Sequence, residues 1–209
     1  MASRTVTLVA LSALAALSAG CPPPPPPPPP PAPVAAAIPT APKCESFSEK
    51  CVASTDTRAK ITNTALVFTP ATSWVYAQQS SATVAQASES GPVIVFLGVD
   101  VDVKDAKKAN ATKDAAIVEL CKQAGLNPLK RKVTWSKPDD KKSLGVISLD
   151  LWQLDEAGVR GPKKGPLLVV AGVTPSGKGI VGLGFVPDDD KSASDAAIMK
   201  SIESIGIAK

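Results

Sequence analysis

GPLLVVAGVTPSGKGIVGLGFVP, residues 165–187, is the stretch that decides the fold. Two apolar runs of strand length, residues 167–173 and 179–186, flank a short stretch of Thr, Pro, Ser, Gly and Lys. Pro fixes the backbone angle φ and Gly permits positive values, so this composition between two apolar runs is typical of a turn. The segment therefore predicts two neighbouring antiparallel strands joined by a hairpin.

The centre of this hairpin, GVTPSGKG at residues 172–179, resembles a phosphate-binding loop. Gly172, Gly177 and Lys178 occupy the required positions, but Gly179 stands where such a loop needs a hydroxyl for Mg²⁺. A phosphate-binding loop must also be followed by a helix, whereas the next residues, IVGLGFV, favour a strand. We therefore expect a turn here, and no nucleotide partner.

The rest of the chain predicts short strands and two helices. An apolar period of three to four across residues 117–124 favours a helix that Gly125 ends. The expected strands are residues 65–69, 74–78, 83–87, 92–98, 132–136, 144–154, 167–173 and 179–186, and the expected helices are 115–125 and 192–205. Short connections favour antiparallel neighbours, so the expected class is α+β, a central mainly antiparallel sheet flanked by helices.

Four features follow one another over most of residues 65–205: LVFTPATSWVYAQ at residues 66–78, the long central strand and helix, the hairpin at 165–187 and the final helix SDAAIMKSIESI at 194–205. Together they resemble the PsbP-like group of α/β/α domains. In that group a central antiparallel sheet is flanked by helices, and the last helix follows a strand hairpin. Its members are typically secreted or membrane-associated accessory proteins, so the resemblance implies an accessory role and transfers no catalytic residue.

The first twenty residues predict a signal peptide, because Arg4 precedes an uncharged run that ends in small residues. The end of that run, LSAGC at residues 17–21, resembles the lipobox of bacterial lipoproteins, with Ser18 where Leu is usual. The resemblance implies a lipid on Cys21, which would hold the protein on a membrane of the cell envelope, at the bacterial outer membrane or periplasmic face. An ordinary secreted protein whose first cysteine lies at the cleavage point is the alternative.

Ten consecutive prolines, Pro22 to Pro31, follow Cys21. Proline cannot donate a backbone hydrogen bond and fixes φ, so the run favours a polyproline II rod of about 3.1 Å per residue. We expect residues 21–43 to form a disordered, proline-rich stalk and residues 44–209 to form a single α+β domain. The net charge of +4 is too small to indicate a nucleic-acid partner.

Three cysteines remain after Cys21. In an oxidising envelope, Cys44 and Cys51 are expected to form a disulfide, which requires a bent or looped segment between them. Cys121 lies on the apolar side of the predicted helix, where an inert buried thiol is expected rather than a nucleophile.

The chain contains no histidine, which removes Ser-His-Asp triads, Cys-His pairs and the commonest metal ligand. The spacing Ser-x-x-Lys is also absent. Acidic residues 188–190 could supply oxygen ligands to Ca²⁺, but the calcium-loop pattern is missing and helix capping explains them better. No metal and no cofactor is therefore predicted.

The locally basic stretch of Lys130, Arg131, Lys132 and Trp135 is a candidate anion-binding patch. Lysines that keep an exposed edge strand soluble are the alternative explanation. Together these features predict a lipid-anchored, non-enzymatic binding or accessory module whose partner is an envelope protein or an anionic polymer. An envelope hydrolase that uses Ser, Lys and carboxylates, or a Ca²⁺-stabilised structural domain, are the alternatives.

Overall fold

The structure is a computed structural model that describes residues 44–145, 147–173 and 178–207. The predicted signal peptide, the lipidation residue Cys21 and the proline stalk of residues 21–43 lie outside the described residues. The folded part contains two antiparallel sheets and two α-helices.

The larger sheet has the strand order β3-β4-β5-β9-β8-β7-β6, and the smaller sheet has the order β1-β2-β10. Every pair of neighbouring strands is antiparallel. The elements are β1 (Ala59–Lys60), β2 (Leu66–Phe68), β3 (Val75–Gln78), β4 (Thr83–Gln86), β5 (Val93–Asp100), α1 (Ala106–Gln123), β6 (Asp140–Ser143), β7 (Ser148–Arg160), β8 (Lys163–Val173), β9 (Lys178–Phe185), the 3₁₀ helix η1 (Asp188–Asp190), α2 (Lys191–Glu203) and β10 (Gly206–Ile207).

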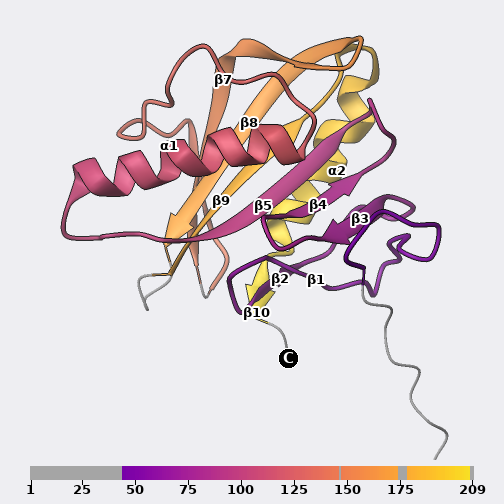
Figure 1. The fold of residues 1–209 in the computed structure, drawn as a ribbon, viewed down its shortest axis with the longest axis horizontal. Helices are drawn as coiled ribbons and strands as arrows, with labels where there is room; N and C mark the ends of the chain where they lie inside the picture. The colour runs from indigo at the N-terminus through magenta and orange to yellow at the C-terminus, as the bar shows by residue number, and fades with distance from the viewer. Residues whose placement is uncertain (1–43, 146, 174–177, 208–209) are drawn as a thin grey trace, which may run out of the picture. The chain divides into compact units, whose positions relative to one another are not determined.

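The large sheet is covered on both faces, with α1 in front of it and α2 behind it (Figure 1). Side chains alternate between the two faces of a strand. In β5, Val93 and Val95 belong to the core beneath α1, whereas Ile94 and Phe96 belong to the core that includes α2 and the small sheet. The predicted α+β class, with a mainly antiparallel sheet flanked by helices, is confirmed.

Glycines in β9 make room on the α2 side of the sheet. A Cβ atom at Gly182 would lie 2.5 Å from the ring of Phe96, and one at Gly184 would lie 3.1 Å from Ile198 in α2. Leu183, the residue between them, points to the other face and is buried beneath α1. The glycines that interrupt this apolar run therefore let an aromatic ring and a helix approach the sheet closely.

Arg160, the last residue of β7, is buried and joins four segments. Its Nε donates to Ala124 O at 2.6 Å, and its Nη1 donates to Ser88 O at 3.0 Å and Gly91 O at 2.7 Å. Its Nη2 donates to the Gln86 side chain. Burial lowers the pKa of Arg160 to about 10, so the guanidinium stays charged at neutral pH and holds the end of α1 against β4.

Three predicted elements need correction. The first helix begins at Ala106 rather than at residue 115, because Asp105 caps it by accepting hydrogen bonds from the backbone of Lys107 and Lys108. Residues 132–136 form no strand, and the charged edge strand β6 follows them instead. Strand β7 continues to Arg160, six residues beyond its predicted end at 154, with an irregularity between Leu154 and Gly158.

The Gly182→Ala substitution should lower the free energy of unfolding by about 1–3 kcal/mol, because the new methyl group would overlap the Phe96 ring. Urea unfolding followed by circular dichroism measures this. Gly206→Ala is the matched control, since a Cβ there meets only Ser204 O at 4.0 Å, and its effect should stay within about 0.5 kcal/mol. Equal effects of the two substitutions would contradict the packing role of Gly182.

Candidate functional site

A pocket of about 460 Å³ lies between α2 and the segment that follows β2. Its apolar surface comes from Pro70, Ala71, Trp74 and Ala197. Hydroxyl groups and one cation complete the lining, from Thr55, Thr69, Thr72, Ser201, Ser204 and Lys200. A mostly apolar cavity of a few hundred Å³ with a few polar groups is the usual form of a ligand site.

Backbone hydrogen bonds hold Trp74 in this pocket. Strand β2 ends at Phe68, and after Pro70 the Trp74 N–H donates to Ala71 O at 3.0 Å in a tight turn. The carbonyl of Trp74 accepts from Ala53 N–H at 2.8 Å, which brings the segment after the disulfide alongside. The Trp74 side chain is only 7% exposed, so it forms the floor of the pocket rather than a free surface.

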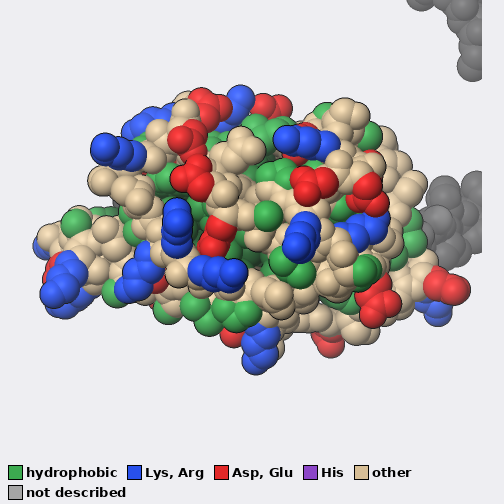
Figure 2. Space-filling view, turned by 90° about the horizontal axis from the view of Figure 1, so that it is seen from above, with side chains coloured by type: hydrophobic (Ala, Val, Ile, Leu, Met, Phe, Trp, Pro, Cys, Tyr) green, Lys and Arg blue, Asp and Glu red, His purple; other side chains and the backbone are tan. Residues whose placement is uncertain are grey.

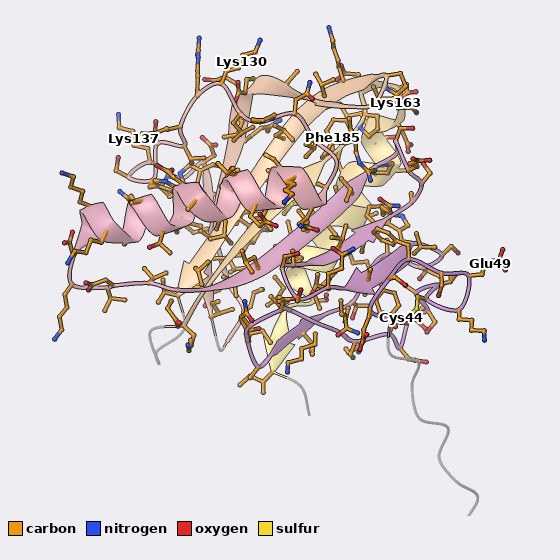
Figure 3. All side chains as sticks on the ribbon, in the orientation of Figure 1. Cys44, Glu49, Lys130, Lys137, Lys163 and Phe185 are labelled. Carbon is orange, nitrogen blue, oxygen red and sulfur yellow. A yellow bond between two sulfur atoms is a disulfide. The ribbon has the colours of Figure 1, made fainter. Side chains whose placement is uncertain are left out.

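The predicted disulfide between Cys44 and Cys51 is present, with the two Cα atoms 5.6 Å apart. The segment between them is looped, and Cys51 N–H donates to Ser48 O at 2.9 Å. Tyr76 N–H in turn donates to Cys51 O at 2.9 Å, so the disulfide loop covers the outer edge of β3. Figure 3 shows Glu49 projecting outward from this loop, beyond Cys44.

Two of the pocket hydroxyls, those of Ser201 and Ser204, are engaged with the backbone. Ser204 Oγ accepts from Thr69 N–H and donates to Ser201 O, both at 2.7 Å. Ser201 Oγ donates to Ala197 O at 3.0 Å. A nucleophilic serine needs a base that accepts its proton, and these two protons go to backbone carbonyls instead. Ser201 and Ser204 are therefore arranged as hydrogen-bond donors to the backbone and not as activated nucleophiles.

Two acidic residues, Glu156 and Asp114, contact the predicted anion-binding patch. The backbone N–H groups of Lys130 and Arg131 donate to the carboxylate of Glu156, with the closest N···O distance 3.1 Å. Lys132 lies 3.7 Å from Asp114, and Trp135 Nε1 donates to the same carboxylate at 2.8 Å. The four patch residues therefore all lie in the connection between α1 and β6, and the carboxylates of Glu156 and Asp114 offset part of its positive charge.

A groove of about 290 Å³ borders this connection. Its charged lining is mixed, with three basic and three acidic residues: Arg131, Lys132, Lys137, Asp139, Asp155 and Glu156. Basic and acidic side chains are likewise interspersed on the surface in Figure 2. Lys130 and Lys137 lie well apart along the connection (Figure 3). Anion binding by Lys130, Arg131, Lys132 and Trp135 stays a prediction.

The structural context of Lys178 is that of a hairpin. Lys178 is the first residue of β9, which pairs antiparallel with β8, so a strand follows it where a phosphate-binding loop needs a helix. Its amine bonds to Asp100 on the neighbouring strand β5. The predicted turn itself, residues 174–177, lies outside the described residues.

The acidic run at residues 188–190 forms the 3₁₀ helix η1, which leads into α2. Asp190 occupies the N-cap position of α2, but its side chain makes no capping bond and accepts from Ser194 Oγ at 2.8 Å instead. The prediction of capping by this side chain is therefore wrong. Asp189 pairs with Lys163 at 2.9 Å, and this hydrogen bond lowers the pKa of Asp189. Among the described residues, no three His, Cys, Asp or Glu side chains are grouped to hold a metal ion.

The comparisons with known proteins assign no family. No family model matches the chain, and no curated protein matches it. Among solved structures it is similar to the Saccharomyces cerevisiae Ran-binding protein Mog1p, at 10% identity and a TM-score of 0.38, over 72% of this chain and 95% of that one. A likeness of that size supports no assignment of function. Within the described residues, neither helix is long and apolar enough to cross a membrane.

Cys121 in α1 should resist alkylation in the folded protein. It is a free, buried thiol, and burial raises its pKa to about 11, so only about one molecule in a thousand carries the reactive thiolate at pH 8. Peptide mapping after iodoacetamide treatment at that pH should show Cys121 unmodified in the native chain and modified in guanidinium chloride. Fast modification without denaturant would contradict the inert role.

Proposed function

We propose that this protein is a lipid-anchored component of the bacterial cell envelope whose single domain is a non-enzymatic binding or accessory module. The pocket beside α2 is the observation that carries the binding role. It combines an apolar floor with hydroxyl groups and the cation of Lys200, which suits recognition of a partner or ligand more than chemistry on one.

The anchor rests on the sequence at residues 1–21, and the disulfide supports the same location. A bridge such as that between Cys44 and Cys51 persists in oxidising compartments, which include the bacterial periplasm. The proline stalk then serves as a spacer between the lipid and the domain. The antiparallel sheet with a helix on each face supports membership of the PsbP-like group, whose members are typically accessory proteins.

The Cys21→Ala substitution should release the protein from the membrane. The unaltered protein should enter the detergent phase of a Triton X-114 separation, and its mature N-terminal peptide should carry acyl chains in mass spectrometry. The Cys21→Ala form should carry no lipid and stay in the aqueous phase. An unacylated Cys21 in the unaltered protein would contradict the anchor without bearing on the pocket.

Blocking the pocket should weaken partner capture. Full-length, C-terminally tagged protein from detergent-solubilised membranes should retain one envelope protein in near-equal amount. Thr72→Trp, which adds bulk at the exposed rim, should reduce that recovery at least about tenfold, a loss of about 1.4 kcal/mol in binding. Ala115→Trp, at an exposed site of α1 on the other face of the sheet, is the control and should retain the partner. Equal recovery with the two variants would contradict a binding role for this pocket.

A further inference from the structure

Lys113 in α1 is a partly buried cation that forms no ion pair with any residue that the structure describes. Two other described lysines are buried to a similar degree, and each has a close carboxylate: Lys142 lies 3.2 Å from Glu203, and Lys163 lies 2.9 Å from Asp189. Within the described part of the chain, no carboxylate lies at salt-bridge distance from the Lys113 amine. Burying a charge is costly unless it is paired, so this exception points to an external partner.

Lys113 lines a cavity of about 300 Å³ at one end of the large sheet. Lys141 from β6 lines the same cavity, together with Ser148 and Asp150 from β7. The remaining walls are mostly apolar and come from Val101, Trp152, Ala171, Gly172, Val173 and Ile180. The cavity therefore offers two cations, one carboxylate, a hydroxyl and an aromatic wall in a space that suits a small molecule.

The carboxylates near Lys113 leave one positive charge uncompensated. Asp150 lies 3.4 Å from Lys141, which makes it the ion-pair partner of that lysine. Asp114 accepts from the Trp135 indole at 2.8 Å and lies 3.7 Å from Lys132. Burial lowers the pKa of Lys113, and the more distant attraction of Asp150 and Asp114 does not cancel that effect. An anion next to the amine would stabilise its charged form.

The Lys113 side chain is also held in place before any ligand arrives. Its amine lies over the ring of Trp135, 4.4 Å from the ring centre, in a cation–π contact. Trp135 is fixed by its bond to Asp114 and packs edge-to-face on Trp152, with ring centres 5.1 Å apart. A cation fixed in this way loses little conformational entropy on binding.

We propose that this cavity binds a small organic anion, an apolar or planar group that carries one carboxylate or phosphate, with Lys113 as its main charged ligand. Lys141 and Ser148 supply further donors, and Trp152 and the aliphatic walls contact the apolar group. The cavity is lined by residues of α1, β6, β7, β8 and β9 and by Val101, and it shares no lining residue with the pocket beside α2, so this inference stands independently of the proposed partner.

Nuclear magnetic resonance of the detergent-solubilised full-length protein tests the proposal, because the indole N–H signals of Trp135 and Trp152 report on the cavity. The probes are benzoate, inorganic phosphate and benzamide, the neutral isostere of benzoate. Lys113→Met removes the charge and keeps an unbranched side chain over Trp135. Lys122→Met is the matched control, since it removes an exposed lysine from the last turn of the same helix.

Benzoate should shift both indole signals in a saturable manner, and benzamide should bind at least about tenfold more weakly. Lys113→Met should weaken benzoate binding about tenfold, and Lys122→Met should leave it unchanged. Saturation by phosphate and not by benzoate would support the site and identify phosphate as its anionic group. The proposal is overturned if neither anion saturates the signals, if benzamide equals benzoate, or if Lys113→Met binds like the unaltered protein. The comparison of benzoate with benzamide needs no variant, so misfolding of Lys113→Met would not remove the test.

Discussion

Coverage of β5 and β9 on both faces is the constraint on which the rest of this structure depends. The buried apolar residues of these strands must fit either beneath α1 or against α2 and the small sheet. On the α2 side the space is limited. Because Gly182 and Gly184 have no side chain, Phe96 and Ile198 can pack directly against the strand. The position of α2 follows from that close approach, and it brings Ser201 and Ser204 opposite the Thr69 backbone and so closes the pocket.

The strands of the hairpin were predictable because they are apolar on both faces and interrupted by glycine. The elements that were mispredicted lack such a pattern. The first turns of α1 are polar, with Ala109 the one buried residue among Lys107, Asn110 and their neighbours, so a cap at Asp105 rather than an apolar stripe marks their start. Strand β6 has the sequence DKKS and is mostly exposed, as is typical of a charged edge strand. A search for alternating apolar residues cannot detect such a strand.

The candidate sites were harder to predict because each joins segments that are distant in the sequence. Thr69 and Ser204 are 135 residues apart, and their hydrogen bond defines one wall of the pocket. Residues 132–136 resemble a strand because Val133 and Trp135 alternate, yet they form no strand. Both side chains pack with the core beneath α1, and Trp135 contacts Trp152 and Asp114. The same contacts convert Lys113 from an ordinary helix lysine into a partly buried one.

Arg160 and Lys113 are both cations that burial destabilises, but the two differ in how their charge is compensated. The guanidinium of Arg160 is compensated by four hydrogen bonds, three of them to backbone carbonyls, so its charge is fully used in holding α1, β4 and β7 together. The amine of Lys113 lies over one aromatic ring, Lys113 lines a cavity, and its charge is compensated only in part. Desolvation opposes the charged form of both groups. An incoming anion would therefore stabilise the charge of Lys113, whose amine is less fully hydrogen-bonded, more than that of Arg160. That difference in compensation assigns Arg160 to the framework and Lys113 to binding.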